Sequence, residues 1–236
     1  MKSTRKLAAL VATLPAFAFT AVSCPVGDAP KGVISGVTDI SFEVGDDSLP
    51  APKTGQKLQA KASLNGSGDI LYAWVLGSNT IPGQTGTTLE VLPEYYHSTI
   101  SLLAYRESYI GAIVSKPTPK VNLDSGMPAI QDGDISLELS QPPTVGVELE
   151  AHLTDNAGNS RTDETGSFIN TAVYIWWRSD NNDDDNHLVN IAGGKASTYV
   201  VGEEDLGSWI TVWAVSPGFS SCVKSNLVGP VAGGSK

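Results

Sequence analysis

The sequence contains few of the residues on which metal centres and most active sites depend. It has 2 cysteines and 3 histidines among 236 residues, and no CxxC pair or closely spaced Cys/His set that would indicate zinc. The three histidines, His97, His152 and His187, lie outside nucleophile-elbow and His-x-x-His contexts. No Gly-rich phosphate loop follows a strand and opens a helix. We therefore expect no enzymatic activity and no cofactor.

Basic residues are also scarce. There are 15 Lys and Arg against 25 Asp and Glu, which gives a formal net charge of -10. Binding to nucleic acid or to anionic lipid needs basic patches, so both classes of partner are excluded. Hydrophobic residues make up 41% and charged residues 17%, while 24 Gly and 14 Pro imply many turns. This composition favours a folded all-β protein.

One long apolar run is present, and it lies at the N-terminus. Basic residues precede it (Lys2, Arg5 and Lys6), and the run from Leu7 to Val22 is interrupted by Pro15 and ends in small residues. This pattern predicts that residues 1–23 are a secretory signal peptide cleaved after Ser23. The run is shorter than the roughly 20 residues of a stable membrane span. We expect an exported bacterial protein that is secreted, periplasmic or on the cell surface.

Cleavage leaves Cys24 at the start of a tail, residues 24–31, and two fates for this cysteine stay open. Residues 21–24 are a permissive match to a bacterial lipobox without its usual leucine, so a lipid on Cys24 would anchor the protein to a membrane. The alternative is a disulfide with Cys222, because exported proteins sit where thiols oxidise. Closing that long loop would stabilise the fold by at most about 4–5 kcal/mol.

The rest of the chain consists of short alternating runs separated by Gly, Pro, Asn and Asp, and it repeats itself. Successive residues are spaced by 7, 12 and 15 positions in each of two series: Ile81, Thr88, Ile100 and Ser115, then Ile191, Thr198, Ile210 and Ser225. The second copy is longer in two places, which predicts longer hairpin loops there. We expect one domain over residues 32–121 and a second over 128–232, each as long as a β-sandwich.

Residues shared by the two copies define the expected core. Tyr72 and Trp74, like Tyr174 and Trp176, are two positions apart on a strand and so share a face. The same holds for Ile100, Leu102 and Ala104 and for Ile210, Val212 and Ala214. A buried Trp on an early strand and alternating apolar residues on a late one are typical of an immunoglobulin-like sandwich. The predicted fold is two tandem immunoglobulin-like β-sandwich domains.

At these residues the chain resembles bacterial immunoglobulin-like modules. The similar segments are Gly-x-x-Leu-x-Ala, Tyr-x-Trp, the run Ile-Pro-Gly-Gln-Thr-Gly-Thr-Thr-Leu-Glu-Val at 81–91, and Ile-Ser-Leu-Leu-Ala at 100–104. Such modules occur in intimin- and invasin-type adhesins and in Zir-type secreted exoproteins. The resemblance covers about 200 residues and implies a contact protein at the bacterial surface or after secretion. It is weak for activity, because one fold hosts many functions. The second copy departs from it at 191–195, which lacks the Pro and the Thr-Gly turn.

Acidic clusters offer weaker candidates for chemistry. The run 180–187, which includes Asp183, Asp184 and Asp185, is rich in oxygen ligands but lacks the spacing of a calcium loop. We interpret it as a solvated hairpin tip, with calcium as a weak alternative and zinc at His187 as a weaker one. The triplet Glu203–Asp205 is interpreted as a solvated turn rather than as the acid pair of a glycosidase.

The clearest functional candidate is a set of aromatic residues that only the second copy has. If Tyr174 and Trp176 point inward, Ile175 and Trp177 point outward; by the same alternation Trp209 and Trp213 point outward. We expect the three tryptophans to form one exposed patch on neighbouring strands, because clustered exposed aromatics mark interfaces.

Three kinds of cover for this patch remain open. The tail 24–31 or the first copy covers it within the chain, a partner protein binds it, or a sugar stacks on it. The favoured function is protein–protein contact. The alternatives are a carbohydrate-binding accessory protein, with Glu203 or Asp205 as polar contacts, and a structural surface lipoprotein.

Overall fold

The computed structural model describes residues 30–42, 51–131, 133–156, 162–182, 187–194 and 196–234. The predicted signal peptide, Cys24 and the acidic residues Asp183, Asp184 and Asp185 lie outside these ranges, so the predictions made for them stay predictions. None of the helices within the described ranges has the length and apolar composition that a bilayer crossing requires.

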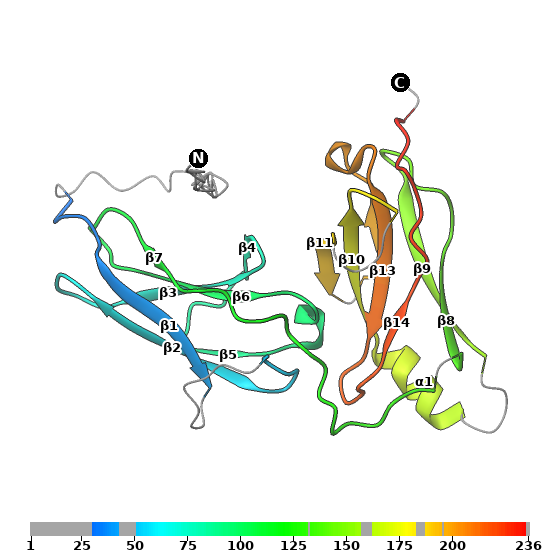
Figure 1. Cartoon of the computed structure of the whole chain (residues 1–236), viewed down its shortest axis with the longest axis horizontal. Helices are drawn as coiled ribbons and strands as arrows, with labels where there is room; N and C mark the ends of the chain where they lie inside the picture. The colour runs from blue at the N-terminus through cyan, green and yellow to red at the C-terminus, as the bar shows by residue number, and fades with distance from the viewer. Residues whose placement is uncertain are drawn as a thin grey trace, which may run out of the picture.

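The first half of the chain folds into two antiparallel sheets packed face to face, which we call domain 1 (Figure 1). One sheet has the order β1-β2-β5, with β1 Gly36–Phe42, β2 Lys57–Leu64 and β5 Thr88–Glu90. The other has the order β4-β3-β6-β7, with β4 Asn79–Thr80, β3 Leu71–Leu76, β6 Ile100–Tyr105 and β7 Ile113–Val114. A short 3-10 helix, η1 Pro93–Tyr95, connects β5 to β6.

The second half, domain 2, repeats this arrangement. Its sheets have the orders β8-β9-β12 and β11-β10-β13-β14. The strands of the first sheet are β8 Ile135–Leu139, β9 Glu148–Asp155 and β12 Thr198–Val200. Those of the second are β11 Val189–Gly194, β10 Val173–Ser179, β13 Trp209–Val215 and β14 Cys222–Lys224. The described part of domain 2 also contains α1 Thr162–Thr171 and the 3-10 helix η3 Glu203–Asp205.

The sequence repeat is therefore a structural repeat down to single hydrogen bonds. The side-chain hydroxyl of Ser115 accepts a bond from the Leu102 N–H in domain 1, as that of Ser225 does from the Val212 N–H in domain 2. Isolated parallel bridges join residue 53 to 122 and residue 144 to 232 at equivalent places. The predicted fold, two tandem immunoglobulin-like β-sandwiches, is confirmed.

Each domain has its own core, and the strand alternation explains its composition. The predicted inward residues Trp74 and Trp176 are 0% and 1% exposed at the centres of two separate apolar clusters. The Trp74 Nε1 donates a hydrogen bond of 2.9 Å to the Gly86 carbonyl oxygen. Trp176 instead stacks on Tyr199 with 5.6 Å between ring centroids. The two core tryptophans thus occupy equivalent positions, but among the described residues only the Trp74 Nε1 has a hydrogen-bond partner.

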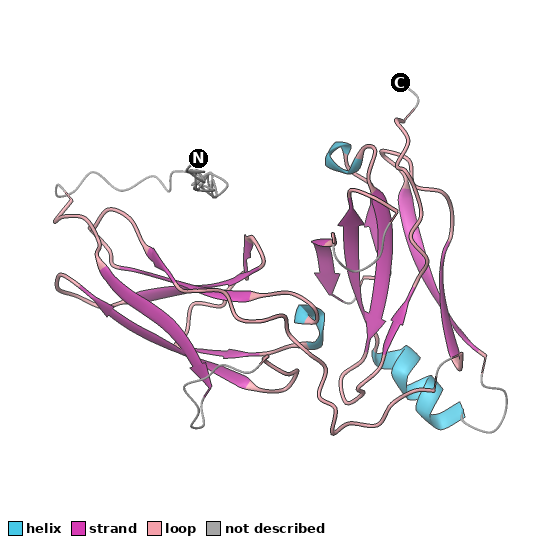
Figure 2. Ribbon diagram, viewed as in Figure 1, coloured by secondary structure: helices cyan, strands magenta, loops and turns pink. Residues whose placement is uncertain are grey.

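The larger insertion in domain 2 departs from the expected hairpin loop, because it contains α1, which lies at one end of the sandwich (Figure 2). Phe168 on α1 is fully buried and meets Phe219 edge-on, with 5.5 Å between ring centroids. The Thr165 hydroxyl donates a 3.0 Å hydrogen bond to Asp155. The segment contains Gly, Ser and several Thr, which are weak helix formers. The helix is therefore stabilised by the tertiary burial of Phe168 rather than by local helix propensity.

The second copy departs from the first in sequence at 191–195, and it also departs in strand pairing at Ile191. Trp176 pairs with Ala192 but Trp177 pairs with Asn190, so Ile191 is the extra residue of a bulge in β11. A bulge increases local twist and re-aims side chains. The sequence spacing of the two copies matches Ile191 to Ile81. This one-to-one match does not hold for the strand pairing of β11, because of the bulge.

Candidate functional site

The predicted outward-facing residues of β10 and β13 do lie on the outer face of their sheet. Ile175 pairs with Trp213, and the Trp177 and Trp213 rings are 5.1 Å apart between centroids. These side chains form a cluster separate from the core of domain 2, which we call the joint face: Val173, Ile175, Trp177, Trp213 and Val215. Alternation along the strands thus brought these side chains together as expected.

The expectation that the joint face is exposed is wrong. Ile175, Trp177 and Trp213 are 0%, 2% and 1% exposed. Tyr96 of domain 1 and Leu123 of the connecting segment pack against the same cluster. Of the kinds of cover considered from the sequence, the structure shows domain 1. Burial here removes the energetic reason to expect a free aromatic binding surface on these strands.

The part of domain 1 that covers the joint face is η1 with the turn that follows it, which we call the pole of domain 1. The His97 ring lies 4.9 Å from Trp213 and 5.7 Å from Trp177 between centroids, both in edge-on geometry. Tyr96 lies 5.9 Å from Trp213. Such aromatic pairs each contribute about 0.5–1.5 kcal/mol beyond burial of area. The pole therefore docks end-on against a sheet face (Figures 1 and 2).

Backbone geometry aims the His97 ring at this face. His97 has a φ of 64°, in the left-handed region, and its N–H donates a 2.8 Å hydrogen bond to the Val121 carbonyl oxygen. The Lys120 ammonium lies 2.6 Å from the His97 Nε2. An ammonium has no acceptor, so in this pair the lysine is the donor. The imidazole ring thus enters the aromatic cluster with its Nε2 turned toward Lys120.

The connecting segment is fastened to both domains. The Asp124 N–H donates a 3.3 Å hydrogen bond to the Thr54 hydroxyl in domain 1. Farther along, the Ile130 N–H donates a 2.6 Å bond to the Ser221 hydroxyl, in the turn that leads into β14. The face is closed at its edge by Lys224, whose ammonium lies 4.1 Å from the centroid of the Trp213 ring. These contacts give the joint a defined geometry rather than that of a loose linker.

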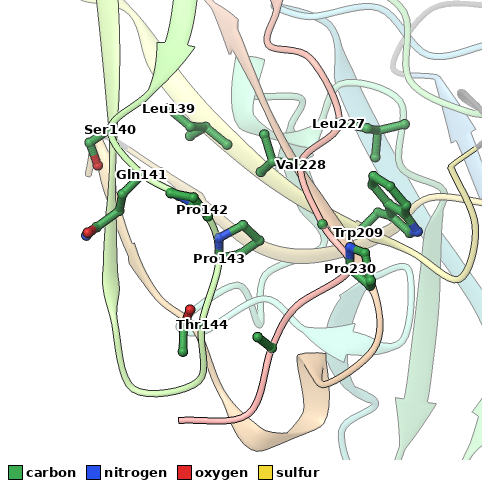
Figure 3. Close-up of a pocket in the computed structure, with 12 residues that line it drawn as sticks. Leu139, Ser140, Gln141, Pro142, Pro143, Thr144, Trp209, Leu227, Val228 and Pro230 are labelled. Atoms are coloured by element: carbon green, nitrogen blue, oxygen red, sulfur yellow. The ribbon is translucent and has the colours of Figure 1, made fainter. Parts of the chain in front are cut away.

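Trp209 is not part of the joint face, so the prediction of one patch of three tryptophans is wrong. It pairs with Ser179 at the start of β13, four residues before Trp213, and it is half-buried. Its ring lines a shallow groove of about 580 Å³ at the end of domain 2 that carries η3 (Figure 3). The side chains around it are mostly apolar: Leu139, Pro142, Pro143, Leu227, Val228 and Pro230.

The backbone at Gly229 passes close to the Trp209 ring. Gly229 has a φ of 153°, and a Cβ there would lie 2.9 Å from the Ser208 carbonyl oxygen and 3.1 Å from the Trp209 Cδ2. Only glycine fits such a position without displacing its neighbours. The groove therefore depends on a residue whose importance is not evident from the sequence pattern.

The residues of the acidic triplet Glu203–Asp205 differ in burial. Asp205 is fully buried: it accepts hydrogen bonds from the Arg178 guanidinium at 3.0 Å and from the Tyr199 hydroxyl at 2.6 Å. Burial, together with the hydrogen bond to Asp205, raises the pKa of Tyr199. Glu203 is exposed. The interpretation of the triplet as a solvated turn is therefore wrong for Asp205, and so is its use as a sugar contact, because its oxygens are already committed.

The described residues offer little else for chemistry. No group of three or more His, Cys, Asp and Glu side chains within them is placed to hold a metal ion. His152 and His187 form exposed pairs with Glu150 and Asp180, at 3.7 Å and 3.5 Å. Cys222 opens β14 and is partly buried beside the joint face, but Cys24 is outside the described residues, so the disulfide stays a prediction.

No protein-family model and no curated protein sequence matches this chain. Solved structures are similar to it at low identity. The three N-terminal domains of the highly immunogenic outer capsid protein of bacteriophage RB49 are 11% identical, with 83% of this chain and 59% of that chain covered and a TM-score of 0.28. The tandem Ig repeats of Dlar are 11% identical, with 86% and 100% covered and a TM-score of 0.26.

Domains 1–4 of Sidekick-1 are also 11% identical, with 84% of this chain and 48% of that chain covered and a TM-score of 0.27. The chain thus spans less than two thirds of the length of the phage structure. The assignment of two immunoglobulin-like sandwiches rests on the strand order and register of the chain itself.

Proposed function

We propose that this protein is an exported, non-enzymatic binding protein of a bacterium that acts by protein–protein contact at the cell surface or after secretion. The observation that carries the proposal is the placement of the tryptophans. Trp177 and Trp213 lock the two domains together, whereas Trp209 and its apolar groove lie at the end of domain 2 that carries η3. A fixed pair of sandwiches that presents an apolar end suits a contact protein.

The groove suits a protein segment better than a sugar. Its lining is dominated by proline and aliphatic side chains beside one half-buried indole, and the nearby carboxylate of Asp205 is committed to Arg178. Sugar recognition combines aromatic stacking with several polar groups aimed at hydroxyls. The carbohydrate alternative also loses the joint tryptophans as a stacking platform, because they are buried. A lipid on Cys24 would add only an anchor.

Photo-cross-linking tests this proposal directly. Trp209→p-benzoylphenylalanine keeps an aromatic group in the groove and should give covalent adducts with a protein in intact cells, detected by mass spectrometry. The control carries the same substitution at Val37, a 69% exposed residue on β1 of domain 1, and should give none. Absence of adducts from position 209 contradicts the proposal. Adducts that resist protease but not glycosidase would instead support a carbohydrate ligand.

A further inference from the structure

The outer face of the four-stranded sheet of domain 1 is uncharged, and none of its residues packs in the joint-face cluster. The strands β4, β3, β6 and β7 contain no charged residue. Alternation places eight side chains on the outer face, six of them apolar or aromatic and two of them hydroxyl-bearing: Leu71, Ala73, Val75, Leu103, Tyr105 and Val114, with Thr80 and Ser101. Val114 at the edge is 54% exposed and Leu103 is half-buried, whereas Val75 and Ser101 are 5% and 9% exposed. In a chain with a net charge of -10, an uncharged sheet face with an exposed apolar edge indicates an interface.

This face occupies the same place in domain 1 as the joint face does in domain 2. Ala73 pairs with Leu103 as Ile175 pairs with Trp213. The next strand continues the equivalence, because Val114 pairs with Leu103 as Lys224 pairs with Trp213. Within one chain, the face in domain 2 is covered by the pole of domain 1. The equivalent face in domain 1 lies outside this contact, since among the described residues none of its side chains packs in the joint-face cluster.

Domain 2 has an equivalent pole, made of η3 and the turn at Leu206 and Gly207. The Gly207 N–H donates a 3.0 Å hydrogen bond to the Val231 carbonyl oxygen, as the His97 N–H does to Val121. Gly207 has a φ of 78° where His97 has 64°. Leu206, at the position of Tyr96, is 54% exposed. The turn that inserts into the joint is thus reproduced in domain 2 and left in solvent.

We propose that the pole of domain 2 docks on the outer sheet face of domain 1 in a second copy of this chain, repeating the contact that joins the two domains within one copy. The inference rests on the proposed function and names its partner. The contact uses different surfaces on the two copies, so it propagates as a chain instead of closing into a symmetric dimer. Both surfaces carry smaller side chains than the joint does, so the association is weak and depends on concentration.

Sedimentation of the mature protein tests the proposal, with reductant present so that cysteines do not cross-link copies. Over protein concentrations from about 10 µM to about 1 mM, the range that detects weak association, the weight-average mass should rise to about twice that of the monomer or more. Added salt should strengthen association, because it screens repulsion between acidic copies. Leu103→Glu in the face and Leu206→Glu in the pole should each keep the protein monomeric.

A mixture of these two variants distinguishes the proposed geometry from a symmetric one. The Leu103→Glu variant keeps an intact pole, and the Leu206→Glu variant keeps an intact face. Mixed together they should form a dimer that grows no further. If the variants block association but the mixture stays monomeric, the pole-on-face arrangement is wrong. Association that neither variant weakens also overturns it, as does a wild-type protein that stays monomeric at about 1 mM.

Further variants keep the test valid if Leu103→Glu does not fold. Val114→Glu changes an exposed residue of the same face and should weaken association at least tenfold, whereas Val37→Glu on the opposite sheet should not. The proposed function and this inference fail separately. Adducts between position 209 and a different protein, with a monomeric wild type, would uphold the function and refute self-association. Self-association of the wild type without adducts from position 209 would uphold this inference and refute the proposed function.

Discussion

The imidazole of His97 in domain 1 lies 4.9 Å from the indole of Trp213 in domain 2, measured between ring centroids. One histidine thus bridges the two domains, because the same ring also meets Trp177. The contact explains how domain 2 carries an aromatic outer sheet face, since domain 1 removes that face from water. The turn at His97 thus contributes to the joint together with the connecting segment, which is hydrogen-bonded to both domains.

Replacing His97 should loosen the joint without unfolding either domain. His97→Asn is the preferred change, because Asn tolerates the left-handed backbone that His97 adopts. Loss of two aromatic pairs should weaken the joint by about 1–3 kcal/mol. We expect a red shift of tryptophan emission and a larger radius of gyration in X-ray scattering. His152→Asn, which changes an exposed histidine, is the matched control and should alter neither quantity.

Gly229→Ala should destabilise domain 2 by about 1–3 kcal/mol, because it forces a Cβ into a positive-φ site next to Ser208 and Trp209. The change is measured as a shift in the denaturant midpoint. Gly233→Ala is the control, since a Cβ there meets nothing within 4 Å. Equal effects of the two substitutions would show that the close approach to Trp209 is not what Gly229 provides.

Asp205→Asn should cost about 1–3 kcal/mol of the free energy of unfolding of domain 2, because it replaces the fully buried carboxylate that accepts from the partly exposed Arg178 guanidinium with a neutral amide. Chemical denaturation followed by circular dichroism measures this loss. Glu203→Gln, two residues away and exposed, should change stability by less than about 0.5 kcal/mol. A small effect of Asp205→Asn would mean that water reaches the pair.

The two core tryptophans should respond differently to phenylalanine. Trp74→Phe removes the hydrogen bond from Nε1 to the Gly86 carbonyl oxygen, whereas the buried Trp176 Nε1 has no hydrogen-bond partner among the described residues. Trp74→Phe should therefore cost about 1 kcal/mol more than Trp176→Phe. Denaturation midpoints of the two variants provide the comparison. A larger loss for Trp176→Phe would contradict this account of the two cores.

Alkaline pH should destabilise both domains. Burial raises the pKa of Tyr95 to about 12, with a smaller contribution from Glu94, and burial also raises that of Tyr199. In the unfolded chain these phenols ionise near a pKa of about 10, so the unfolded state loses protons first as the pH rises. The free energy of unfolding should be constant below about pH 9 and should fall between about pH 10 and 12. Tyr95→Phe should flatten this fall for domain 1, and a stability that does not change up to about pH 11 would contradict the assignment.

Much of the fold was predictable because it depends on local alternation and on repetition. The matched spacings of the two copies correspond to the same strand order, and Trp74 and Trp176 occupy the predicted core positions. Helix α1 was not predictable, because its stability comes from burying Phe168 rather than from helix-forming residues. The bulge at Ile191 was not predictable for a similar reason, since it depends on how β10 and β11 pair.

The sequence by itself determined which side of each strand the aromatic residues occupy, because a strand alternates with a period of two whatever surrounds it. Only the tertiary structure decided which of those sides meets water. Trp213 lies under a histidine 116 positions earlier in the chain, and Trp209 lies four residues away in a groove shaped by Gly229. Contacts between residues so far apart depend on how two folded domains meet, and no local pattern encodes that.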